Sequence, residues 1–139
     1  MGRHEIGFRL RNDLSELETL RTKLDQFKAE ADIPDKTLFE LNLILDELFT
    51  NVVSCGYRDM DEHWVEIAIS REGKLLTLCV MDDGVPFNPS TVRALDTSCP
   101  VNERRIGGVG IHLVKRLTDD MAYRRANDRN IVTLSKKLP

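Results

Sequence analysis

The feature that most constrains the fold is a long segment with helical periodicity in the first half of the chain. Its apolar residues recur at steps of three and four, at Leu38, Leu41, Leu45, Leu48 and Val52. That spacing predicts an amphipathic helix with one buried stripe. Glu47 and Asn51 lie four residues apart on another face, so their side chains are neighbours. A carboxylate can accept a proton and an amide oxygen can ligate Mg²⁺, although such a pair is also typical of a solvated helix face.

Length and composition place the chain among ordinary single domains. It has 139 residues, of which 41% are hydrophobic and 31% charged, enough for a single core. Its net charge of -3 provides no general attraction to nucleic acid or to an anionic membrane. No apolar run approaches the roughly 18 residues that a membrane span needs, and the N-terminus lacks the apolar core of a signal peptide. Three scattered cysteines suit reduced thiols. We therefore expect one cytoplasmic domain that binds neither nucleic acid nor membrane.

The order of predicted elements indicates the fold class. Strands are expected near residues 6–10, 65–70 and 75–81, helices at 14–31 and 34–54 and from about 109, and a terminal hairpin from 121–125 and 131–135. This order, β-α-α-β-β-loop-α-β-β, predicts an α+β two-layer sandwich in which the helices cover one face of a mixed, mostly antiparallel sheet. The strand at 75–81 is nearly all apolar, which predicts burial on both faces.

Two glycine-containing segments are candidates for ligand binding. Asp82-Asp83-Gly84 follows the apolar strand, and Gly107–Gly110 precede a predicted helix. Backbone amides that open a helix form an anion site, because the first-turn N–H groups are unpaired and the helix dipole favours negative charge. A flexible hinge is the alternative interpretation of the second segment. The stretch between them has no sustained period, and a loop of that length in a small domain is usually functional or mobile.

Three blocks in a fixed order resemble the nucleotide site of the GHKL (Bergerat-fold) ATPase superfamily. Glu47-x-x-x-Asn51 matches the N box, Asp82-Asp83-Gly84 the first glycine box and Gly108-Val109-Gly110 the second. Residues 46–51, 82–89 and 106–115 are similar in detail to one branch, the RsbW-like anti-sigma factor serine/threonine kinases. The resemblance covers nearly the whole chain, so it implies one ATP-binding, kinase-like domain over residues 1–139.

The resemblance implies a role for each residue of the three blocks. Asn51 would hold Mg²⁺ through its amide oxygen, and Glu47 would act as the general base for an attacking hydroxyl. Asp82 would accept a hydrogen bond from the adenine amino group, and Gly84 would let the base approach closely. The phosphates would be bound by Arg105, Gly108, Val109 and Gly110. Residues from about 88 to 107 would form the ATP lid.

The same resemblance implies a function and partners. The protein is expected to be an ATP- and Mg²⁺-dependent serine/threonine kinase that phosphorylates a STAS-domain anti-sigma factor antagonist. A sigma factor and a second copy of the chain are further expected partners. Whether ATP or ADP is bound in the lid region would decide which partner the protein holds. Pro86 departs from the superfamily pattern, since many members have a second glycine there. The basic pairs Lys115-Arg116 and Arg124-Arg125 are typical of solvated faces.

Other classes remain as alternatives. A non-catalytic module could bind ATP or ADP and regulate a partner through its lid alone, although the intact Glu47 argues against it. The catalytic domain of a histidine kinase would need an upstream hairpin with a phosphoacceptor histidine, for which the first 35 residues leave no room. Larger relatives such as gyrase need a transducer domain, which we do not expect here. A DNA-binding function has no basic stripe to support it.

Overall fold

A computed structural model of the chain describes residues 2–57, 59–89 and 109–139, with the side chains of 109 and 110 excepted. The elements, in chain order, are β1 (Arg3–Arg11), a 3-10 turn (Leu14–Glu16), α1 (Leu17–Ala31), α2 (Asp35–Cys55), β2 (Trp64–Glu72), β3 (Leu75–Asp82), α3 (Val109–Leu117), β4 (Asp120–Ala126) and β5 (Arg129–Lys137). The predicted order of elements is therefore confirmed for the described residues.

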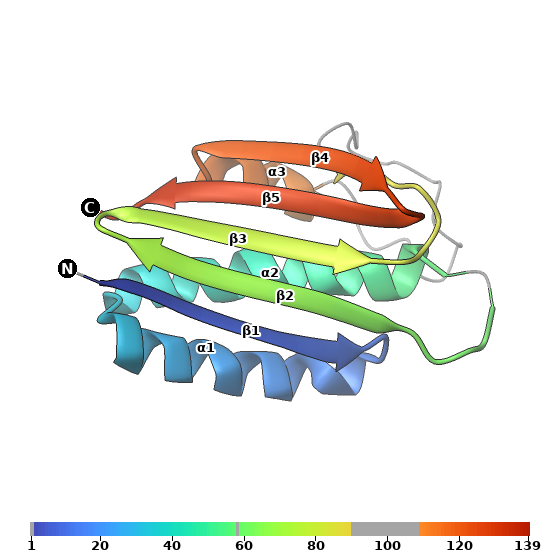
Figure 1. The fold of residues 1–139 in the computed structure, drawn as a ribbon, viewed down its shortest axis with the longest axis horizontal. Helices are drawn as coiled ribbons and strands as arrows, with labels where there is room; N and C mark the ends of the chain where they lie inside the picture. Colours follow the sequence, from blue (N-terminus) through green and yellow to red (C-terminus); the bar gives the residue numbers. More distant parts are fainter. Residues whose placement is uncertain (1, 58, 90–108) are drawn as a thin grey trace.

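The strands form one sheet in the order β1-β2-β3-β5-β4, and every neighbouring pair is antiparallel. One row of paired residues crosses the whole sheet, through Phe8, Ile67, Val80, Val132 and Tyr123. Figure 1 shows α1, α2 and α3 together behind one face of the sheet. The predicted two-layer α+β sandwich is confirmed, with a sheet that is antiparallel throughout its described strands.

The core lies between the sheet and the helices. On α2, Leu41, Leu45 and Leu48 are buried as the periodicity predicts, and Ile44 and Phe49 widen the buried face. Burial of each such side chain stabilises the fold by about 1.5 to 3 kcal/mol. Leu20, Leu24 and Phe27 do the same on α1, and Ile111 and Val114 on α3.

The first helix begins later than its apolar spacing predicts. Leu14 belongs to the 3-10 turn and is 45% exposed, so the predicted start of the helix at residue 14 is wrong. Asp13 accepts a hydrogen bond from the Ser15 amide at 2.9 Å, while Glu16 accepts from the Arg11 amide at 2.9 Å. Asp13 therefore caps a separate turn before α1, and Glu16 joins that turn to the end of β1.

Two further expectations are corrected by the structure. In β3, Leu76, Leu78 and Val80 are buried against the helices, but Cys79 and Met81 on the other face are only half-buried. The prediction of burial on both faces is therefore wrong, because neighbouring strands rather than a second layer cover those side chains. The thiol of Cys79 is free, whereas Cys55 is disulfide-bonded, so the expectation of reduced thiols is wrong for Cys55.

The terminal hairpin has the shortest turn that antiparallel strands use. Ala126 pairs with Arg129, which leaves Asn127 and Asp128 as the two turn residues. Both have positive φ angles, 52° and 60°. This left-handed backbone at both positions defines a type I′ turn, for which Asn and Asp are favoured residues. The turn fixes the register of β4 against β5, and with it the place of Asn130 at the start of β5.

Candidate functional site

The candidate site lies at the end of the sandwich where α2 and β3 end. Figure 1 shows the C-terminal ends of both elements on the right, beside the β4–β5 turn. Asn51 comes from the last turn of α2, one turn after Glu47, and Asp82 is the last residue of β3. The fold therefore brings together two of the predicted blocks that are about thirty residues apart in the sequence.

Asp82 is a buried carboxylate held by two donors. Its exposed fraction is 4%. Its Oδ1 accepts hydrogen bonds from the Gly84 amide at 2.8 Å and from Asn130 Nδ2 at 2.9 Å. Burial raises the pKa of Asp82 because it disfavours the charged form, although the hydrogen bonds from Asn130 and Gly84 act in the opposite direction. Because both of these hydrogen bonds go to Oδ1, Oδ2 is the oxygen with capacity to accept from a ligand.

Gly84 lies against the backbone at the end of α2. The Val85 amide donates to the Gly56 carbonyl at 2.7 Å. A Cβ atom on Gly84 would lie 2.3 Å from that same carbonyl oxygen, which no real side chain tolerates. Glycine is therefore required here because two backbone segments touch. This requirement is separate from the close approach of a base that the sequence resemblance implies, which stays a prediction.

Asn130 is the residue that the sequence analysis missed. It is 3% exposed and lies opposite Asp82 in the pairing of β3 with β5. Besides Asp82, its Nδ2 donates to the Val85 carbonyl at 2.8 Å, and its Oδ1 accepts from the Tyr123 hydroxyl at 2.6 Å and from the Phe87 amide at 3.3 Å. One amide side chain thus joins the glycine box to both strands of the terminal hairpin. Its buried polar atoms are all paired, so we expect it to be rigid.

Arg125 also holds the glycine box, against expectation. Its guanidinium donates to the Gly84 carbonyl at 2.7 Å. The side chain is half-buried, whereas Arg124 is exposed. The assignment of this basic pair to a solvated face is therefore wrong for Arg125, because alternation along β4 turns one residue of each adjacent pair toward the helices.

A small cavity connects Asn51 with Asp82. It has a volume of about 20 Å³, and the residues around it are Leu48, Asn51, Val52, Val80, Asp82, Phe87, Pro89 and Val132. Asn51 is 9% exposed. The cavity has room for about one water molecule. A purine ring would enter only if part of the lining moves, and Phe87 and Pro89 lie on the loop side of the cavity.

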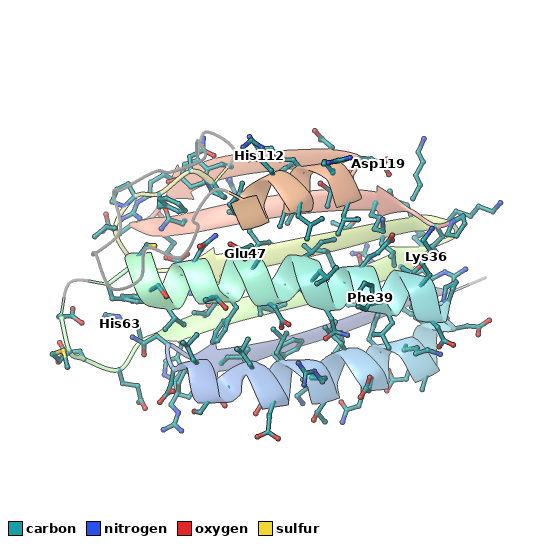
Figure 2. All side chains as sticks on the ribbon, turned by 180° about the vertical axis from the view of Figure 1, so that it is seen from behind. Lys36, Phe39, Glu47, His63, His112 and Asp119 are labelled. Atoms are coloured by element: carbon teal, nitrogen blue, oxygen red, sulfur yellow. The ribbon has the colours of Figure 1, made fainter. Side chains whose placement is uncertain are left out.

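The remaining predicted residues lie around this cavity or outside the described part of the chain. Figure 2 shows Glu47 on the side of α2 nearer to α3, and the side chain is half-buried. Val109 and Gly110 begin α3, as the glycine cluster predicts. Arg105, Gly108 and nearly all of the predicted lid lie outside the described residues. The roles assigned to all of these residues stay predictions.

The chain belongs to the histidine kinase-like ATPase domain family, whose profile matches residues 10–136. This family has a GHKL-type ATPase fold. The resemblance drawn from the three blocks is therefore confirmed at the level of the family. ATP binding follows from that membership, and the cavity between Asn51 and Asp82 is its candidate place.

Two proteins are similar to this chain over most of its length. The serine/threonine-protein kinase BtrW of Bordetella bronchiseptica is 22% identical over 97 residues, which are 70% of this chain and 68% of BtrW. The crystal structure of the RsbU and RsbW domains of Rv1364c from Mycobacterium tuberculosis has the same fold. It matches 96% of this chain with a TM-score of 0.68 and 16% sequence identity. This chain spans only 32% of that longer protein.

None of the helices among the described residues combines the length and the apolar character that a membrane span requires.

Proposed function

We propose that this protein is an ATP-dependent serine/threonine protein kinase that acts as an anti-sigma factor and phosphorylates a STAS-domain antagonist. The observation that carries the proposal is the shared cavity of Asn51 and Asp82, the N-box amide and the first-glycine-box carboxylate of an ATPase-family chain. The similarity to the kinase BtrW supports transfer to a protein hydroxyl. Phosphoryl transfer needs chiefly positioning and charge stabilisation, which a domain of this size can supply.

The adenine end of the nucleotide would lie at Asp82. Its Oδ2 would accept a hydrogen bond from the adenine amino group while Oδ1 keeps the bonds from Gly84 and Asn130. The apolar lining from Leu48, Val80 and Val132 suits the faces of a purine ring. Asp82 is thus the residue that would distinguish adenine from a base without an amino group at that position.

The phosphate end would lie toward Asn51 and the start of α3. Asn51 offers an amide oxygen, a ligand type that Mg²⁺ accepts, at the wall of the cavity. In residues 2–57, 59–89 and 111–139 no group of three or more His, Cys, Asp or Glu side chains could hold a metal ion. Asn51 would complete a Mg²⁺ site together with nucleotide phosphates, since Mg²⁺ commonly keeps only one or two protein ligands. The ion would offset phosphate charge there.

The other roles are carried over from the sequence. Glu47 would accept the proton of the attacking serine hydroxyl, one helical turn from Asn51. The backbone amides of Gly108, Val109 and Gly110 at the start of α3, with Arg105, would bind the phosphates. Residues 88–107 would close over the nucleotide, and the choice between ATP and ADP would select between the STAS-domain antagonist and a sigma factor. A second copy of the chain is a further proposed partner.

The first experiment compares Asn51→Ala with Asn42→Ala by thermal unfolding in Mg²⁺-ADP and Mg²⁺-ATP. Asn42 is on the same helix, its Nδ2 donates to the Leu38 carbonyl, and it does not line the cavity, so it is a matched control. Ligand at about 100 times its Kd should stabilise the native state by about 2.7 kcal/mol. We expect a Mg²⁺-dependent rise in Tm for the wild type and for Asn42→Ala, and none for Asn51→Ala.

Transfer to protein needs a second measurement. With labelled ATP and a STAS-domain protein, the wild type should phosphorylate a serine, and Glu47→Gln should lose transfer while it still binds Mg²⁺-ATP. A Glu47→Gln variant with undiminished phosphorylation would remove the general-base role. Nucleotide binding without transfer in the wild type would instead favour the non-catalytic, lid-regulated module.

A further inference from the structure

A second cluster of ionisable side chains lies on the outer side of the Asp82–Gly84 turn. The imidazole of His63 is between two carboxylates: Nε2 is 2.8 Å from Asp59 Oδ1, and Nδ1 is 3.2 Å from Asp83 Oδ1. Tyr57 stacks on this ring with the ring centroids 4.2 Å apart, and its hydroxyl donates to Asp83 Oδ1 at 3.1 Å. These side chains join the loop after α2 to the glycine box.

The position of His63 is set by its backbone rather than by these side-chain contacts. The Asn12 amide donates to the His63 carbonyl at 3.0 Å, and the His63 amide donates to Asn12 Oδ1 at 3.0 Å. The two bonds fasten the loop to the end of β1, and a substitution of the imidazole leaves them in place. The ring is therefore presented to Asp83 by the scaffold, with 19% of the side chain exposed.

The protonation state of the ring follows from its two partners. Both ring nitrogens face carboxylate oxygens, and an ionised carboxylate only accepts hydrogen bonds. A neutral imidazole carries one N–H, so it can bond to Asp59 or to Asp83 but not to both. The imidazolium has two N–H donors and satisfies both carboxylates. The geometry in the structure is thus the geometry of a charged histidine.

We propose that His63 is a positioning residue for the nucleotide site: as an imidazolium it holds Asp83, and so fixes the Asp82–Gly84 turn for adenine binding. Nucleotide affinity then falls when His63 loses its proton. This inference rests on the proposed adenine-binding role of Asp82. The inner side of the turn is fixed by hydrogen bonds from Asn130 and Arg125, and His63 is the titratable attachment on the outer side.

The pKa of His63 agrees with this role. Burial lowers the pKa of His63, but the hydrogen bonds and charges of Asp59 and Asp83 together outweigh burial, and the net direction is upward from 6.5. Burial, and then the charges of Asp82 and Asp83, raise the pKa of Tyr57, so its phenol stays a neutral donor. A raised folded-state pKa means that the stabilisation is complete below the ordinary histidine value. It is lost as pH rises through the folded-state value.

Other charged groups line the surface hollow of about 490 Å³ that His63 shares with Asp83; they are Arg9, Glu62, Glu66, Asp128 and Arg129. The two arginines have other partners. The Arg9 guanidinium lies 4.3 Å above the centre of the Trp64 ring, and Arg129 forms an ion pair with Glu66. Among the described residues, the ion pairs of His63 are with Asp59 and Asp83. These two carboxylates are therefore the groups whose removal should shift its titration.

The test is the Kd of the full chain for Mg²⁺-ADP, measured by calorimetry between about pH 6 and pH 9, the range that brackets histidine titration. His63→Gln is compared with His4→Gln, an exposed histidine on β1. In the wild type and His4→Gln, Kd should rise roughly 3- to 10-fold with pH, the effect of about one lost hydrogen bond. His63→Gln should bind as weakly at low pH as at high pH. Ratios of Kd between variants at each pH cancel the titration of the nucleotide.

Asp59→Asn distinguishes an effect of the His63 charge from a merely structural effect of its ring. It removes one carboxylate from His63 without touching the glycine box. The imidazole titration, followed by NMR, and the midpoint of the Kd profile should then move together to lower pH. Thermal unfolding of each variant without nucleotide checks that the fold is retained.

The outcomes separate the two proposals. Equal pH profiles for the wild type and His63→Gln, with nucleotide bound by both, would overturn the role of His63 and leave the nucleotide site intact. A midpoint that stays fixed in Asp59→Asn while the imidazole titration moves would overturn it as well. No binding of Mg²⁺-ADP at any pH would overturn the proposed function and this inference together.

Discussion

Asp82 and Asp83 are adjacent carboxylates with opposite surroundings. Asp82 points toward the helices, is 4% exposed, and is held by amide donors from Gly84 and Asn130. The side chain of Asp83 points outward with 49% of its surface exposed and contacts His63 and Tyr57. Alternation at the end of β3 produces this contrast, because successive side chains leave a strand on opposite faces.

The contrast shows how one turn can combine a ligand-binding group with its own support. The inner carboxylate accepts pre-formed hydrogen bonds from the neutral amides of Gly84 and Asn130, so its second oxygen has a defined direction. The outer carboxylate is joined to a charged partner in contact with solvent, where interactions are weaker and depend on pH. We therefore expect changes on the inner side to be large and independent of His63, and changes on the outer side to be small and dependent on pH.

Gly84→Ala should give the largest effect, because it disturbs both sides of the turn at once. The new Cβ would lie 2.3 Å from the Gly56 carbonyl oxygen, so the backbone must move. We expect the free energy of unfolding to fall by about 2 to 3 kcal/mol in chemical denaturation. The matched control is Gly7→Ala on β1, where the nearest atom to a new Cβ is the Ile67 carbonyl oxygen at 4.0 Å. Equal stability of the two variants would contradict the backbone contact.

Asp82→Asn should separate binding from stability. The Asn oxygen can accept from Gly84 and Asn130, but its NH₂ group would face the adenine amino group. We expect Kd for Mg²⁺-ADP to rise about 10- to 100-fold, the value of a hydrogen bond to a charged group.

Asp82→Asn should weaken nucleotide binding but should not destabilise the fold. Burial raises the pKa of Asp82, so the folded state binds its proton more tightly than the unfolded state, and ionisation costs stability as pH rises. Asp82→Asn removes that cost, and its Tm at neutral pH should equal or exceed that of the wild type. The difference should vanish in acid, where Asp82 is protonated in both states. A clear loss of stability at pH 7 would contradict this account.

The sequence predicted those parts of the molecule that depend on local pattern. Periodicities of two and of three to four gave the helices and the strands, including those of the terminal hairpin. The order of the three blocks located Asn51 and Asp82 as parts of one site, which the shared cavity supports. These signals depend on residues close together in the chain or on a resemblance that covers it.

Features that depend on long-range contacts were not predictable in this way. Asn130 lies opposite Asp82 only because β5 pairs with β3, and nothing in the local sequence gives that register. The contact between Gly84 and Gly56 likewise joins segments that are separated by a whole hairpin. His63 was assigned no role because its partners are carboxylates on the same loop and at the end of β3. Each of these residues supports the site through contacts that only the folded chain creates.

Asp83→Asn should give the smallest effect and is the matched partner of Asp82→Asn. The new amide oxygen can still accept from the Tyr57 hydroxyl, but the charge that pairs with His63 is lost. A half-exposed ion pair is worth about 0 to 1 kcal/mol, so we expect the Kd for Mg²⁺-ADP to rise by up to about 5-fold near neutral pH. Its pH profile, measured by the same calorimetry, should be flatter, because His63 no longer holds a charged group of the turn. A loss as large as that of Asp82→Asn would show that both carboxylates contact the nucleotide, and the division into an inner and an outer side would be wrong.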